Sequence, residues 1–203
     1  MKRFTTSWMR VMLLGLVSLF AIQEAGAATV SYEGINYTTK GTNATVKRYT
    51  FKKGDTTFYK GDIVIPETFE LKGITYTVVA TAANAFVDCR ELTSLQLPKT
   101  CVTIGRNCFK GCTALKNITL PSSLKSIGST AFEYTAVDSM TFPESVTNIG
   151  KMAFWECPNL AVARIQNRST TFGEDAFDKS ALLIIPESNS GLRSWAKAHG
   201  NTY

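Results

Sequence analysis

The chain has 203 residues, of which 44% are apolar and 19% are charged, and its formal net charge is +6. This length supports one domain of ordinary size, and the apolar fraction excludes an intrinsically disordered chain. Threonine makes up about one residue in eight, which favours strands over helices. The sequence has a single histidine, His199, which excludes most histidine-dependent catalysis and most histidine-based metal sites.

The first 27 residues have the organisation of a secretory signal peptide. Three basic residues come first, an apolar run over residues 11–22 follows, and Ala25 and Ala27 place small side chains before the expected cleavage point. Twelve residues make about 18 Å of helix, too short to cross a bilayer core of about 30 Å. We therefore expect an exported chain that begins near residue 28, in the periplasm, at the cell surface or secreted, with no integral membrane segment after signal removal. A retained membrane anchor is the alternative.

A repeat of 22 or 23 residues organises most of the remaining chain. A small residue followed by phenylalanine marks its five copies, at Phe86, Phe109, Phe132, Phe154 and Phe177. In most copies an Ile-Gly pair lies five and four residues before the phenylalanine. An apolar ladder of the form L-x-x-L-x-L follows each phenylalanine in the first four copies and ends in proline in the first three.

This period and this ladder are typical of a leucine-rich-repeat solenoid, a β-rich fold of stacked coils. Equivalent positions of successive coils lie over one another and build a continuous core. Each ladder predicts a short strand whose alternate residues face inward, and these strands pair in parallel along one face. The glycine after the isoleucine suits a tight, left-handed bend, and the small residue before the phenylalanine allows close packing beneath the ring.

The pattern V/L-x-x-I-G-x-x-A-F-x-x-C-x-x-L-x-x-I-x-L-P resembles the BspA-like family of bacterial surface leucine-rich-repeat proteins. Its clearest copy is residues 124–132, and the resemblance covers about residues 60–190. The chain departs from the pattern at Thr81-Ala82 in the first repeat, in a third repeat that is one residue short, and in a fourth repeat without its proline. The resemblance implies a solenoid that serves adhesion or host-protein binding at the bacterial surface.

The sequence predicts four segments. Residues 1–27 are the signal peptide, residues 28–75 form an N-terminal β cap with the strands that lead into the repeats, residues 76–190 are a solenoid of about five repeats, and residues 191–203 are a C-terminal helical cap. A solenoid needs such caps because its terminal coils would otherwise expose their core.

Both caps have local sequence signals. Antiparallel strands are expected at residues 35–37, 44–46 and 49–51, with turns at 41–43 and 53–55. A separate binding domain is the alternative for this cap. At the other end, the expected helix has one apolar face that covers the last coil, and a glycine stops it. That face and that stop are Leu192, Trp195, Ala196 and Gly200.

The five cysteines occupy apolar positions of the repeat. Cys89, Cys112 and Cys157 share one position, Cys108 replaces the alanine before a phenylalanine, and Cys101 takes a position that is aliphatic in the next two copies. We interpret them as small buried hydrophobic residues. A Cys89–Cys112 disulfide between adjacent coils is an alternative, and a metal site is disfavoured because the sequence has no C-x-x-C motif.

No combination of residues offers catalytic chemistry. The acids with the best spacing fall in turns or at variable repeat positions, where solvated surface explains them; they are Asp88, Glu91, Glu144, Glu174 and Asp175. The sequence has no nucleophile elbow, Walker loop or dinucleotide fingerprint. We therefore predict a protein that is not an enzyme and that uses no cofactor and no metal.

The outward positions of the strands predict a binding face. They form a polar, nearly uncharged ribbon with a basic end, made of Ser94, Gln96, Asn117, Thr119, Ser139, Thr141, Val162 and Arg164. Such a face can hydrogen-bond to an extended chain or a glycan, and solenoids bind through it. A merely solubilising surface is the alternative.

An aromatic pair is the second candidate binding site. The position after the phenylalanine holds Lys110, Glu133 and Asp178 in three copies, so it is expected to face water, yet it holds Trp155 in the fourth. Tyr134 takes the next position one coil earlier, so the two rings are expected side by side on the solvent side. Exposed aromatic residues are common binding hot spots. A tryptophan folded back over a neighbouring loop is the alternative.

Together these features predict an exported, non-enzymatic protein-binding or adhesion module of the bacterial envelope or surface, whose partner is an extracellular or host protein. A glycan-binding component of an envelope uptake system is the alternative, and an envelope hydrolase is a third. Removal of residues 1–27 would lower the net charge from +6 to +4. This charge, spread along the chain without a basic cluster, disfavours nucleic acid as a partner.

Overall fold

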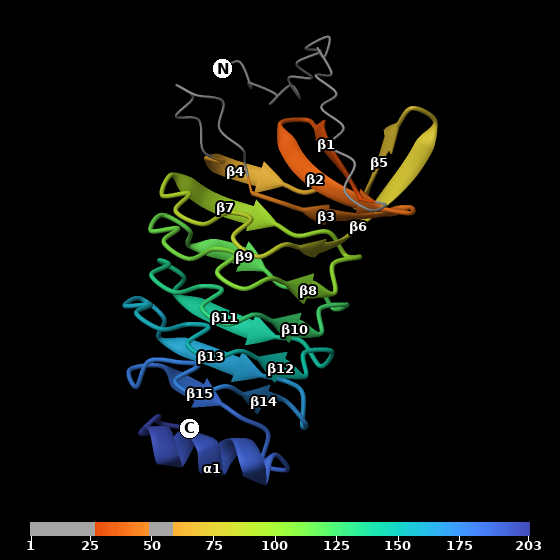
Figure 1. The fold of residues 1–203 in the computed structure, drawn as a ribbon. Coiled ribbons are helices and arrows are strands. Elements are labelled where there is room, and N and C mark those ends of the chain that lie inside the picture. The colour runs from red at the N-terminus through yellow and green to blue at the C-terminus, as the bar shows by residue number, and fades with distance from the viewer. Residues whose placement is uncertain (1–26, 49–58) are drawn as a thin grey trace, which may run out of the picture.

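The computed structural model describes residues 27–48 and 59–203. Within these ranges the chain forms a stack of coils that runs from a cap of β-strands to a helix at the C-terminus (Figure 1). The predicted signal peptide up to residue 26, the strand expected at 49–51 and the turn expected at 53–55 lie outside the described residues. In the described part, no helix has the length and apolar character needed to cross a membrane.

The N-terminal cap is built of antiparallel strands, as predicted. Strand β1 (Ala28–Tyr32) pairs antiparallel with β2 (Ile35–Lys40), and β2 pairs antiparallel with β3 (Asn43–Val46). Strand β3 then pairs in parallel with β6 (Ile74–Thr81), which also forms a hairpin with β5 (Thr68–Leu71). The cap therefore shares one continuous sheet with the coils that follow.

An aromatic cluster ties the two hairpins of the cap together. The ring of Phe69 lies 4.6 Å from that of Tyr37, 5.1 Å from that of Tyr32 and 5.3 Å from that of Tyr76, measured between centroids. Phe69 and Tyr37 are buried. Burial raises the pKa of the Tyr37 hydroxyl well above its usual range.

The predicted L-x-x-L-x-L strands form along one face of the stack. They are arranged in two parallel ladders: β4 (Gly61–Val64), β7 (Leu92–Gln96) and β9 (Asn117–Thr119), then β11 (Ser139–Phe142), β13 (Val162–Ile165) and β15 (Leu182–Ile184). Figure 1 shows these arrows one above the other down the solenoid. We call their outer surface the strand face.

A third parallel ladder, which was not predicted from the sequence, runs along the Ile-Gly positions. It continues β6 in parallel through β8 (Thr103–Ile104), β10 (Ser126–Ile127), β12 (Asn148–Ile149) and β14 (Thr171–Phe172). Each of these strands has two residues, so no alternation along the sequence reveals them. Their pairing becomes evident only when successive coils are stacked.

The glycines that follow these strands are needed for close approach and not for a left-handed bend. Gly105, Gly128, Gly150 and Gly173 all have an ordinary backbone φ. A Cβ on any of them would lie 2.3–2.5 Å from backbone atoms of the preceding coil. The expectation of left-handed backbone at these glycines was therefore wrong, whereas the steric reason for a missing Cβ holds.

The left-handed backbone lies instead two residues before each phenylalanine. That position has a φ between 50° and 59° in all five copies, at Asn84, Asn107, Thr130, Met152 and Asp175. Of these five residues, only the two asparagines and the aspartate adopt this region readily. The turn geometry is thus imposed by the stack, even where the local residue disfavours it.

Stacked aromatic rings fill the centre of the solenoid. The five repeat phenylalanines are all buried, with successive ring centroids 4.8–5.3 Å apart. Tyr59 extends the stack at its N-terminal end, 4.8 Å from Phe86. The small residues before the phenylalanines are buried as expected: Ala85, Cys108, Ala131, Ala153 and Ala176.

A ladder of hydroxyl groups joins successive coils on the turn after the strand face. Each hydroxyl donates a hydrogen bond to a backbone carbonyl of the coil before it: Thr100 to Val78 at 2.6 Å, Ser123 to Cys101 at 2.7 Å, Ser145 to Leu124 at 2.6 Å and Thr170 to Val146 at 2.8 Å. Each of these carbonyls thereby has a hydrogen-bond donor from the next coil.

The C-terminal helix covers the last coil as predicted. Helix α1 (Ser190–His199) begins after Asn189, whose side chain accepts a hydrogen bond from the helix backbone, and ends at Gly200 with a left-handed φ of 76°. Leu192 and Ala196 are buried on its inner face. Trp195 packs edge-on against Phe172 at 5.0 Å.

The cysteines are buried core residues, in agreement with the sequence analysis. All five lie in the described residues, and all five are unpaired thiols. Burial raises the pKa of Cys89 and of Cys101 to about 11, and it raises those of the other three as well. Such thiols stay protonated at neutral pH, which makes them poor nucleophiles.

Candidate binding surfaces

The strand face presents the predicted polar ribbon. Six of the eight predicted positions are exposed, and the other two, Ser94 and Val162, are half-buried. Parallel pairing sets equivalent residues side by side in two columns: Ser94 with Asn117 and Gln96 with Thr119 in the first ladder, and Ser139 with Val162 and Thr141 with Arg164 in the second. The structure therefore groups all eight on one surface.

Two features at the ends of the strand face were missed. Asp62 stands at the N-terminal end, where its carboxylate accepts hydrogen bonds from the hydroxyls of Thr93 at 2.7 Å and Ser94 at 2.6 Å. These hydrogen bonds lower the pKa of Asp62. Val64 is 63% exposed at this end and Leu182 is 38% exposed at the other. The ribbon thus has an apolar residue at each end, which the pattern of strands 61–64 and 182–184 could have revealed.

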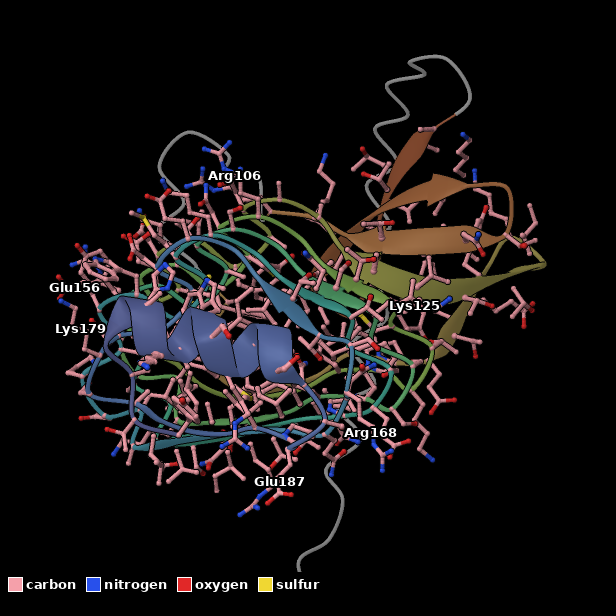
Figure 2. The ribbon with its side chains drawn as sticks, turned by 90° about the horizontal axis from the view of Figure 1, so that it is seen from below. Arg106, Lys125, Glu156, Arg168, Lys179 and Glu187 are labelled. Atoms are coloured by element: carbon pink, nitrogen blue, oxygen red, sulfur yellow. The ribbon has the colours of Figure 1, made fainter. Side chains whose placement is uncertain are left out.

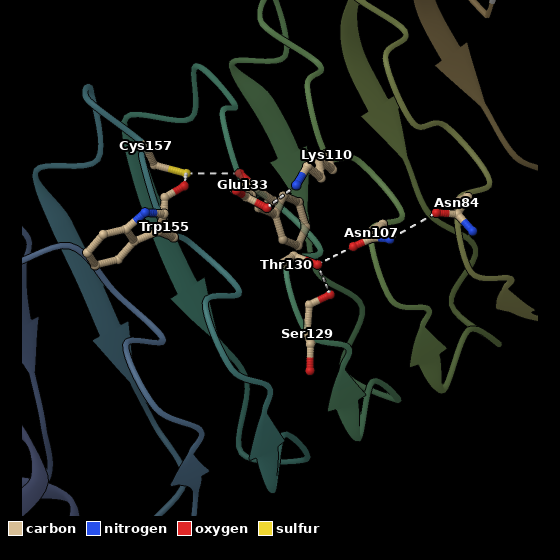
Figure 3. A network of polar contacts seen from close by, with 9 residues as sticks. Asn84, Asn107, Lys110, Ser129, Thr130, Glu133, Trp155 and Cys157 are labelled. Carbon is tan, nitrogen blue, oxygen red and sulfur yellow. Dashed lines mark hydrogen bonds and ion pairs between the residues drawn. The ribbon is translucent and has the colours of Figure 1, made fainter.

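The position after each phenylalanine is less exposed than expected. It lies on what we call the loop edge, formed by residues 105–116, 128–138 and 150–161. Glu133 is only 7% exposed, and its carboxylate pairs with the ammonium group of Lys110 at 2.7 Å (Figure 3). Trp155 is half-buried at the same position. The expectation that this position faces water freely was therefore wrong, because neighbouring coils pack against it.

The structure does not join Tyr134 and Trp155 into an aromatic platform. In the described residues their rings make no stacking contact; the backbone N–H of Tyr134 donates to the carbonyl of Trp155 at 3.2 Å. The Tyr134 ring is 47% exposed and lies 5.9 Å from the ammonium nitrogen of Lys110. Figure 3 shows the indole of Trp155 directed away from the Lys110–Glu133 pair. Tyr134 is thus associated with a cation.

Tyr134 is also held in a left-handed backbone conformation, with a φ of 62°. Asp88, Gly111 and Glu156 take the same conformation at the same position of their coils. A bulky aromatic residue adopts this region at a cost of about 1–3 kcal/mol. The coil therefore presents an exposed ring at a position where stability alone would favour glycine or asparagine.

A shallow basic groove crosses the loop edge. Its volume is about 360 Å³, and it is lined by Arg106, Asn107, Lys110, Ser129, Thr130, Lys151 and Met152. A side-chain ladder fixes one wall: the Asn107 amide donates to Asn84 at 3.0 Å, and Thr130 donates to Asn107 (Figure 3). The groove was not predicted from the sequence, because its cations come from two coils that are far apart in the sequence and are separated by a third coil.

Metal ligands do not gather in the part of the chain that the structure describes. Residues 27–48 and 59–203 contain no group of three or more histidine, cysteine, aspartate or glutamate side chains that could hold an ion. His199 stacks on Trp195 with ring centroids 4.0 Å apart, and its Nδ1 lies 2.8 Å from the Trp195 carbonyl oxygen. The histidine thus belongs to the C-terminal cap.

Parallel ladders on a repeat of 22 or 23 residues, closed by a strand cap and a helix, define a leucine-rich-repeat solenoid. The family model described as "BspA type Leucine rich repeat region" matches residues 80–196 in six copies. The chain therefore belongs to the BspA-type leucine-rich-repeat family, as the resemblance predicted. No curated protein matches the sequence.

Solved structures of bacterial leucine-rich-repeat proteins share the fold. A leucine-rich-repeat protein of T. pallidum is 28% identical with a TM-score of 0.59, over 70% of this chain and 63% of that one. A leucine-rich cell surface protein of Faecalibacterium prausnitzii is 23% identical with a TM-score of 0.56, over 79% and 51%. The pneumococcal vaccine antigen PcpA is 17% identical with a TM-score of 0.54, over 89% and 48%. The chain thus spans less than two thirds of each of these proteins.

Proposed function

We propose that this protein is an exported, non-enzymatic module of the bacterial envelope or surface that binds an extracellular or host protein, as an adhesin does. The observation that carries the proposal is the strand face, where exposed polar side chains stand in register across the coils. Export is supported by the signal-peptide pattern of residues 1–27. Membership of a repeat family that builds interaction scaffolds supports the absence of catalysis.

The composition of the strand face suits an extended protein segment. Hydroxyl and amide groups at Gln96, Asn117, Thr119 and Thr141 both donate and accept hydrogen bonds, so they can pair with a main chain of any sequence. Arg164 supplies one cation toward the C-terminal end, and Asp62 supplies one anion at the other. This opposite polarity would orient a partner along the stack.

The size of the face sets the scale of the complex. Specific protein–protein interfaces bury roughly 1,200–2,000 Å² in total, which requires contacts along several coils. Two three-stranded ladders of the described chain lie on this face. Exposed Val64 and Leu182 at its ends would add apolar contacts outside the polar centre.

The test is a binding screen of the purified chain on arrays of extracellular-matrix proteins and of glycans. A Thr141→Lys variant changes the middle of the strand face, and Thr113→Lys makes the same change at an exposed site on the loop edge. We expect binding to a protein that Thr141→Lys weakens at least tenfold, about 1.4 kcal/mol, and that Thr113→Lys leaves within twofold. Binding to glycans alone, or equal sensitivity to both variants, would contradict the proposal.

A further inference from the structure

The basic groove on the loop edge is a second candidate site that the strand-face proposal does not use. Its cations come from two coils, Arg106 and Lys110 from one and Lys151 from the next coil but one, and Ser129 and Thr130 line it from the coil between. Figure 2, seen along the stack from the C-terminal end, shows Arg106 on the side of the solenoid opposite Arg168. The groove volume of about 360 Å³ lies at the lower end of the range for small-ligand sites, roughly 300–1,000 Å³.

The three cations of the groove differ in their partners. Lys110 is held by the nearly buried Glu133, and Lys151 is paired with the exposed Glu174. Arg106 is exposed and forms no ion pair with any acidic residue in the described parts of the chain. A guanidinium group presents a planar fork of donors that matches a carboxylate or a sulfate. Arg106 is thus the group of the groove that is available to bind an anion.

The polar wall of the groove is already fixed in position. The hydrogen bonds from Asn107 to Asn84 and from Thr130 to Asn107 hold this wall across three coils. Ser129 also lines the groove, and its hydroxyl forms no hydrogen bond with the described residues. A free hydroxyl beside a free guanidinium can bind neighbouring oxygen atoms of one ligand without a rearrangement of the coil.

The lining indicates which class of anion fits. Met152 is the one apolar side chain among the seven lining residues, so the groove suits a ligand rich in hydroxyl groups and not a hydrophobic peptide. The exposed ring of Tyr134 adjoins the groove through Lys110 and offers a flat apolar face on which a sugar ring can stack. We propose that this groove binds an acidic saccharide, with Arg106 on its carboxylate or sulfate and Tyr134 against a sugar ring.

Calorimetry of the purified full chain with a heparin tetrasaccharide tests this site. The desulfated, N-acetylated tetrasaccharide and a hexaglutamate peptide are the comparison ligands. Arg106→Gln removes the proposed anchor, and Arg168→Gln removes the same charge on the opposite side, where Arg168 is also exposed. We expect Arg106→Gln to weaken heparin binding at least tenfold, Tyr134→Asn to weaken it at least threefold, and Arg168→Gln to change it less than twofold.

Each other outcome overturns the proposal. If the sulfated tetrasaccharide does not bind, the groove is not a saccharide site. Equal weakening by Arg106→Gln and Arg168→Gln would show that net charge alone attracts the ligand. If hexaglutamate binds as tightly as the heparin tetrasaccharide, the groove recognises acidic peptides and is not specific for a saccharide. Melting temperatures of the variants that are no lower than that of the parent chain exclude misfolding as the cause of any loss.

Discussion

A Cβ atom on Gly128 would lie 2.5 Å from the backbone nitrogen of Arg106, which belongs to the preceding coil. The neighbour is backbone, so no side chain can move aside to make room. We expect Gly128→Ala to lower the free energy of unfolding by about 3 kcal/mol, measured by urea denaturation. Gly191→Ala, in helix α1, is the control, because the atom nearest to a Cβ there would be 3.9 Å away. We expect no loss of stability from this change. Equal effects of both changes would contradict the close approach of the coils.

Thr130 is a β-branched residue with a φ of 55°, at a position where two earlier coils have Asn84 and Asn107. Asparagine tolerates this conformation and would continue the side-chain ladder. We expect Thr130→Asn to raise the free energy of unfolding by about 1 kcal/mol. The same substitution at Thr141, an exposed strand residue, should give no gain, because asparagine is disfavoured in strands. A loss at residue 130 would contradict the expected relief of backbone strain.

The hydroxyl of Ser145 donates to the carbonyl of Leu124 at 2.6 Å. Ser145→Ala would leave that carbonyl without this donor, so we expect a loss of about 1 kcal/mol in the free energy of unfolding. Ser122 is exposed on a turn of the coil before it, and Ser122→Ala should change stability by less than about 0.5 kcal/mol. Urea denaturation of the two variants beside the parent chain measures both values. Indistinguishable midpoints for the two variants would count against the hydroxyl ladder.

Cys101 is fully buried, and burial raises its pKa from 9.0 to about 11. Between these two pH values the unfolded chain loses the thiol proton and the folded chain keeps it. Stability therefore falls as pH rises in this window, by about 1.4 kcal/mol per pH unit from this thiol. Cys101→Ala, although less stable at pH 7, should show a shallower decline between pH 9 and pH 11 in urea denaturation. Parallel declines for the parent chain and the variant would show that the thiol ionises without penalty.

Most of the fold could be predicted from the repeat, because side chains at one position of successive coils pack against equivalent neighbours. The phenylalanine stack, the L-x-x-L-x-L strands and the burial of Cys112 and Cys157 all follow from position within the repeat. The helix face of Leu192 and Ala196 follows equally from local spacing. These features depend on short-range periodicity, which a single sequence contains.

Features that depend on contacts between coils could not be predicted in the same way. The two-residue strands carry no periodic signal, and the glycine after them is explained only by the distance to the coil before it. Trp155 was expected on the surface because its position is charged elsewhere, yet Glu133 at that position is nearly buried by its pairing with Lys110. The basic groove combines residues whose proximity arises only from stacking.

Docking of a partner across the strand face can be measured most directly by thiol labelling. All five native cysteines are buried, so a cysteine introduced at Thr119, Thr141 or Thr113 would be the reactive thiol of the folded chain. Maleimide labelling rates are compared with and without a saturating protein partner found on the array. We predict at least tenfold slower labelling at residues 119 and 141 and an unchanged rate at residue 113. Protection at residue 113 with free labelling at 119 and 141 would contradict binding through the strand face.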